Sequence, residues 1–105
     1  MEKINIGKTV AFQDKPTYDM FAYEYIPAGG YKKTAFINAN THGGERESAY
    51  ALARVVDIII NESWRDDRIK WMKDNVRLLI VPSANPYGFN QDVINYNGVD
   101  WGWRK

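Results

Sequence analysis

The segment Arg77–Val81 constrains the fold of this chain more than any other feature of the sequence. After its arginine it contains only aliphatic residues, and Pro82 ends the run. A strand with one face in water alternates between apolar and polar residues, whereas a continuous apolar run is typical of a strand buried on both faces. The segment therefore predicts a central strand in a sheet that is covered by helices.

A helix is predicted to precede this strand. From Glu45 to about Asn61–Ser63, apolar residues recur at spacings of three and four, which places them on one stripe of a helix. A weaker helical segment follows over Asp66–Asn75. The stripe consists of Ala49, Leu52, Ala53, Val56, Ile59 and Ile60, and the buried positions expected around the weaker segment are Trp64, Ile69 and Met72.

Two further strands are predicted before the helix, at Phe21–Ile26 and Lys33–Asn38. Residues 27–30 between them read Pro-Ala-Gly-Gly and suit a turn, so we expect the two strands to pair as a hairpin. A short edge strand is expected at Thr9–Phe12. A crossover through the helix then joins Lys33–Asn38 to the apolar strand. Residues 1–105 are therefore expected to form a single α/β domain.

Charge and composition exclude several classes of partner. The net charge of +1 gives no general attraction to nucleic acid or to an anionic membrane. The first residues lack the apolar core of a signal peptide, and no apolar run is long enough to cross a bilayer. We therefore expect no nucleic-acid or membrane partner and, by default, a cytoplasmic location. Because the chain has no cysteine, any metal site must use histidine, aspartate or glutamate.

The best candidate for chemistry is His42, the only histidine of the chain, with Glu45 three residues later. His42 follows a predicted buried strand, and ligands of α/β sheets bind at strand ends. The two intervening glycines let the backbone bring imidazole and carboxylate to one point, and zinc accepts both ligands. Two plainer interpretations stay open: His42 is an ordinary loop residue, or Glu45 only favours the positive end of the helix dipole.

Two downstream blocks accompany this pair. The apolar strand runs into Pro-Ser-Ala-Asn-Pro-Tyr-Gly-Phe at residues 82–89, and Asn-Tyr-Asn-Gly-Val-Asp follows at residues 95–100. Together with His-x-x-Glu at residues 42–45, these blocks resemble the zinc carboxypeptidase family, the relatives of carboxypeptidase A, in order and spacing. The resemblance covers about Thr34 to Asp100 and corresponds to the early part of the family's catalytic domain.

The resemblance implies a partial, three-layer, truncated α/β fold with a mixed central sheet and flanking helices. It also implies one zinc ion held by two histidines and a glutamate, with water as the fourth ligand. His42 and Glu45 would be the first two of these three protein ligands. In the family, zinc polarises the scissile carbonyl of a peptide substrate and lowers the pKa of its water. A further glutamate accepts the proton, and an arginine binds the terminal carboxylate.

The chain departs from the family pattern in three respects. It has no second histidine, so a third zinc ligand is missing, and we expect no catalytic residue, including the general base, within these 105 residues. Gly102 and Trp103 stand where the family has the Asn-Arg pair that recognises the carboxylate, and Val93 stands where an arginine is frequent. Arg104 is the candidate for a shifted, weaker substrate-binding residue.

Three functions are compatible with these observations. The first is a truncated zinc metallocarboxypeptidase that is inactive alone. The second is a non-catalytic binding or assembly module on the same scaffold, in which a homo-oligomer covers the apolar surfaces left open. The third is a related amidase that acts on cell-wall peptides, and the sequence does not separate this substrate class from ordinary peptides.

Overall fold

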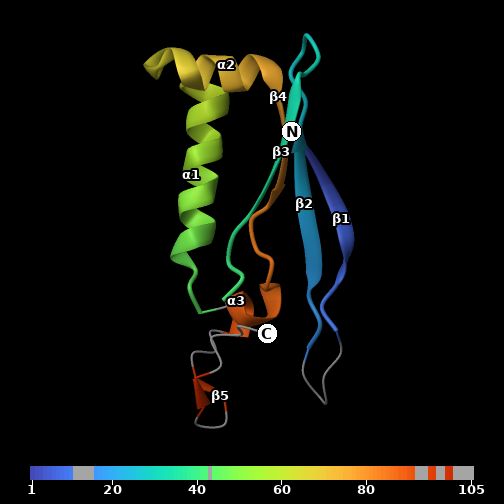
Figure 1. The fold of residues 1–105 in the computed structure, drawn as a ribbon. Helices are drawn as coiled ribbons and strands as arrows, with labels where there is room; N and C mark the ends of the chain where they lie inside the picture. The colour runs from blue at the N-terminus through green and yellow to red at the C-terminus, as the bar shows by residue number, and fades with distance from the viewer. Residues whose placement is uncertain (11–15, 43, 92–94, 97–98, 101–105) are drawn as a thin grey trace.

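The computed structural model describes residues 1–10, 16–42, 44–91, 95–96 and 99–100 (Figure 1). Its elements, in chain order, are β1 (Glu2–Lys8), β2 (Asp19–Tyr25), β3 (Lys33–Asn38), α1 (Glu47–Asn61), the 3₁₀ turn η1 (Ser63–Arg65), α2 (Asp67–Asn75), β4 (Val76–Val81), α3 (Pro86–Gln91), β5 (Asn95–Tyr96) and β6 (Val99–Asp100).

The main sheet is mixed and has the order β1-β2-β4-β3. β3 and β4 run parallel, with Ala35 opposite Leu78, which confirms the predicted crossover. β4 pairs antiparallel with β2 on its other side, where Tyr25 is opposite Leu78. The α/β class with a mixed sheet is therefore confirmed. The expected hairpin between β2 and β3 is wrong, because β4 lies between these two strands.

The edge strand lies earlier than predicted. It is β1, which pairs antiparallel with β2, whereas Thr9 comes after the strand and residues 11–12 lie outside the described residues. β1 combines two isoleucines, which favour strands, with lysine, asparagine and glycine, which do not. A bulge between Asn5 and Gly7 places Gly7 at φ 133°, a conformation that favours glycine. Pairing with β2 stabilises this mixed segment as the edge strand.

The hydrophobic core lies between α1 and one face of the sheet, and α1 runs alongside β3 and β4 in Figure 1. Leu78 and Ile80 on β4 are the most buried of its apolar residues, at 2% and 3% exposed. They pack with Leu52, Val56 and Ile59 of α1, as the apolar stripe predicts. Ala49 is also buried and Ile60 half-buried, whereas Ala53, predicted to belong to this stripe, is exposed.

The opposite face of the sheet differs from the expectation of a strand buried on both sides. Arg77 and Leu79 point to this face and are only half-buried, and Phe36 beside Leu79 is 64% exposed. Arg77 Nε donates to Glu24 Oε2 at 2.7 Å, so an ion pair occupies part of the face. Both long helices, α1 and α2, pack on the core side, so the described residues form two layers rather than three.

α2 follows α1 almost at once and crosses its end (Figure 1). The side chain of Asp66 caps α2 by accepting from the backbone N–H of Arg68 at 2.7 Å. Ile69 and Met72 pack against the core as predicted. Trp64 does not, because η1 turns its side chain outward: it is 77% exposed, with the Arg65 guanidinium 5.5 Å from its ring centroid. None of the described helices is long and apolar enough to cross a bilayer.

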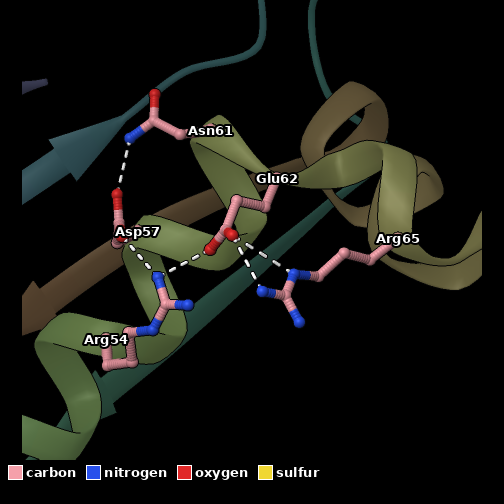
Figure 2. A network of polar contacts seen from close by, with 5 residues as sticks. All are labelled: Arg54, Asp57, Asn61, Glu62 and Arg65. Carbon is pink, nitrogen blue, oxygen red and sulfur yellow. Dashed lines mark hydrogen bonds and ion pairs between the residues drawn. The ribbon is translucent and has the colours of Figure 1, made fainter.

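A network of polar and charged side chains lies at the carboxyl end of α1, as Figure 2 shows. Arg54 donates to Asp57 at 2.7 Å and to Glu62 at 2.6 Å. Glu62 also accepts from Arg65 at 2.9 Å, and Asp57 accepts from Asn61 at 2.8 Å. The hydrogen bonds from Arg65 and then Arg54 lower the pKa of Glu62, and those from Asn61 and then Arg54 lower the pKa of Asp57. The network joins α1 to η1.

Candidate metal centre

His42 and Glu45 lie on the connection between β3 and α1. Because β3 and β4 are parallel, both strands end at the same edge of the sheet, with Asn38 opposite Val81. Pairing continues one residue further, since the N–H of Ala39 donates to the carbonyl of Val81 at 3.0 Å. The connection therefore starts from a well-supported strand end, where α/β sheets bind their ligands.

The structure brings the two predicted ligands together. Nδ1 of His42 and Oε2 of Glu45 are 3.8 Å apart, and the side chains are 37% and 70% exposed. A tight turn produces this approach, because the backbone N–H of Glu45 donates to the carbonyl of His42 at 3.0 Å. Two ligands at about 2.1 Å from a tetrahedral zinc ion lie about 3.4 Å apart. The pair therefore fits zinc after a small closure, and both groups are open to solvent.

Glu45 lies outside the helix rather than in its first turn. α1 begins at Glu47, which is the acidic residue of that turn. The favourable interaction with the helix dipole therefore belongs to Glu47 more than to Glu45. This position weakens the plainer interpretation of Glu45 as a residue that only stabilises the helix start.

Asn40 is a residue of this site that the sequence patterns did not reveal. It is 2% exposed and has φ 55°, a left-handed conformation that asparagine tolerates better than most residues. Its Nδ2 donates to the carbonyls of His42 at 3.1 Å and Glu45 at 3.3 Å. Its Oδ1 accepts from the hydroxyl of Ser83 at 2.7 Å. An asparagine two residues after the predicted strand Lys33–Asn38 was the available signal, because asparagine readily makes a left-handed turn.

The segment after β4 packs beside the turn. Within residues 82–89, a short helix, α3, begins at Pro86. The N–H of Ala84 donates to the carbonyl of Ala39 at 2.9 Å. Arg46 Nε donates to the carbonyl of Phe89 at 2.9 Å, and its guanidinium lies 5.2 Å from the Phe89 ring centroid. These contacts connect α3 to the start of α1.

The other predicted site residue cannot be placed in this geometry. Arg104 lies outside the described residues, as do Val93, Gly102 and Trp103. Asn95–Tyr96 and Val99–Asp100 form a small antiparallel pair, β5 and β6. Within the described part of the chain, no group of three or more histidine, cysteine, aspartate or glutamate side chains is placed to hold a metal ion. Among the described residues, the candidate site therefore consists of His42 and Glu45.

Comparison with known proteins gives a family for this geometry. A family model described as zinc carboxypeptidase matches residues 1–104. No individual curated protein matches the chain. The family match agrees with the mixed α/β sheet and with a histidine–glutamate pair at the end of a parallel strand. The match spans nearly the whole sequence, and the chain therefore belongs to the zinc carboxypeptidase family.

Proposed function

We propose that this chain supplies two ligands, His42 and Glu45, to a carboxypeptidase-type zinc site. The observation that carries the proposal is the 3.8 Å separation between Nδ1 of His42 and Oε2 of Glu45 on a turn at the sheet edge. Family membership supports zinc as the metal and a peptide as the substrate class. When bound, zinc would activate water and polarise a peptide carbonyl. The imidazole and the carboxylate would hold the ion and leave its remaining coordination positions open.

We further propose that the 105-residue chain has no peptidase activity by itself. A catalytic zinc site uses three protein ligands and an open position, and the sequence contains one histidine. Two ligands are expected to bind zinc more weakly than three. Without a placed general base, a bound water would also lack the group that accepts its proton.

Zinc binding to the purified chain tests the first proposal. Zinc is expected to bind at one ion per chain, and both His42→Ala and Glu45→Gln should abolish this binding. Glu47→Gln is the matched control, because Glu47 is an exposed carboxylate two residues away, in the first turn of α1. Equal zinc binding by wild type and His42→Ala would refute the assignment. Chelator-sensitive release of carboxyl-terminal amino acids by the wild-type chain would refute the proposed inactivity.

A second candidate function is an assembly module, and one observation favours it. The sheet face opposite α1 exposes 64% of Phe36, and in the described part of the chain β3 pairs only with β4. An open strand edge beside an exposed aromatic residue is suited to association with another chain. Light scattering over a range of concentrations tests this function. A mass that stays at the 12.2 kDa of one chain would contradict it.

A further inference from the structure

We infer that Asn40 is the positioning residue of this site: its buried carboxamide holds the turn at residues 42–45 and so sets the distance between His42 and Glu45. The inference rests on the proposed function for its meaning, but the geometry behind it concerns only the chain's own atoms. Neither the family match nor the histidine–glutamate motif assigns a role to this residue.

The burial of Asn40 is the first observation. Among the described residues it is the polar side chain most completely removed from water, at 2% exposed. Burying an amide that lacks hydrogen bonds costs about 1–3 kcal/mol in proteins. Such a group is retained in a small domain when its hydrogen bonds offset that cost. The partners of Asn40 therefore indicate what it does.

Those partners belong to the two proposed ligands. Nδ2 of Asn40 donates to the backbone carbonyls of His42 and Glu45, at 3.1 and 3.3 Å. One amide group thus holds both ends of the turn from its inner side. The carbonyl of Glu45 is further fixed by the hydroxyl of Ser48, which donates to it at 3.0 Å. The same hydroxyl accepts from the backbone N–H of Asn40 at 2.8 Å.

The carbonyls of His42 and Glu45 determine which end of the amide faces the turn, because they accept only from Nδ2. Oδ1 then points toward the segment after β4, where it accepts from the hydroxyl of Ser83 at 2.7 Å. The opposite orientation would place an acceptor against two carbonyl acceptors. The turn between His42 and Glu45 is therefore connected, through Asn40, to the segment that follows the central strand. The sequence separation of 43 residues explains why no local pattern revealed this contact.

Asparagine at position 40 has two properties: it tolerates a positive φ, and its amide can hold the turn. The φ of 55° is unfavourable for most side chains, and glycine would adopt it without strain. Glycine, however, has no amide to hold the turn. Alanine would have neither property. Asn40→Gly therefore removes the side chain while it keeps the backbone conformation accessible, and Asn40→Asp keeps the shape while it replaces the donor with an acceptor.

Zinc titration followed by NMR tests the inference. Because His42 is the only histidine, its ring protons give one pair of signals that report the site directly. Mutation of a residue that orients a metal ligand typically lowers metal affinity by about 10–100-fold. We expect Asn40→Gly and Asn40→Asp to raise the zinc concentration at half-saturation by about that factor. Ser83→Ala, which removes one hydrogen bond, should have a smaller effect in the same direction.

Asn75→Ala is the matched control. Asn75 also donates from its amide to a backbone carbonyl, that of Trp71 at 2.9 Å. It lies at the end of α2, far from the connection between β3 and α1 that carries His42 and Glu45 (Figure 1). Asn75→Ala should lower the melting temperature and leave the zinc midpoint unchanged. An unchanged midpoint in Asn40→Gly, with a fall in melting temperature like that of Asn75→Ala, would overturn the inference. If Asn40→Gly does not fold, the zinc midpoint of Ser83→Ala is measured instead, and an unchanged midpoint in that variant would overturn the inference.

Hydrogen exchange without metal separates this inference from the proposed function. The N–H of Glu45 closes the turn, so its exchange should accelerate in metal-free Asn40→Gly relative to wild type and to Asn75→Ala. Unchanged exchange would overturn the positioning role. If the wild-type His42 signals do not respond to zinc, the proposed function fails, while faster exchange at Glu45 would still support the positioning role.

Discussion

Replacing Leu78 by alanine tests whether one face of the sheet carries most of the stability. Leu78 is 2% exposed and lies at the centre of β4, between Tyr25 of β2 and Ala35 of β3. Leu78→Ala removes three carbon atoms, worth about 0.8 kcal/mol each in transfer free energy. The cavity left behind adds to this, so we expect the free energy of unfolding to fall by about 3–4 kcal/mol.

Phe36→Ala is the comparison, because Phe36 lies on the other face of the neighbouring strand. A fully buried Phe→Ala change costs about 3–5 kcal/mol. Phe36 is 64% exposed, so only about a third of that cost, about 1.5 kcal/mol, is expected. The smaller side chain should therefore cause the larger loss. This order reverses what the sizes of the two residues alone would predict.

Urea unfolding followed by far-UV circular dichroism measures both losses. A domain of this size has a total stability of about 5–15 kcal/mol, so Leu78→Ala should visibly lower the urea midpoint. Equal losses for the two variants, or a larger loss for Phe36→Ala, would refute the reasoning. Such a result would mean that another layer or another copy of the chain covers the second face.

Three further predictions concern contacts away from the core. Glu24→Gln should lower the free energy of unfolding by about 2–3 kcal/mol, because it leaves the charge of Arg77 half-buried and without its carboxylate. In urea titrations, replacing both residues by leucine should recover part of this loss. The Arg68 guanidinium and then its backbone N–H lower the pKa of Asp66 to about 2, so the stability from this cap is present above about pH 4 and is lost as the pH falls toward about 2. Asp66→Asn should flatten this part of the curve of unfolding free energy against pH, and an unchanged curve would contradict the capping role. Glu62→Gln should lower the melting temperature slightly at low salt and less at high salt, because the network of Figure 2 is exposed and screened, and a salt-independent change would argue against an electrostatic origin.

Local patterns predicted most elements of this fold. The spacing of Leu52, Val56 and Ile59 placed α1 within two residues of its observed start, since helix periodicity is a property of neighbouring residues. The turn at residues 27–30 forms as expected, with the N–H of Gly30 donating to the carbonyl of Pro27 at 3.0 Å. His42 and Glu45 were predictable as a pair for the same reason, because only two residues separate them and a single turn brings them together.

The tertiary structure alone decided which strands pair and what supports the turn between His42 and Glu45. β4 separates β2 from β3 because the most apolar strand gains most from a central position, a comparison among segments far apart in the chain. The exposure of Phe36 among the described residues depends on where α1 and α2 pack, which the sequences of these helices do not reveal. The role of Asn40 depends partly on its hydrogen bond with Ser83, a residue that only the fold brings next to it. Periodicity is read over neighbouring residues, whereas strand order and buried hydrogen bonds arise from contacts between segments that the folded chain alone brings together.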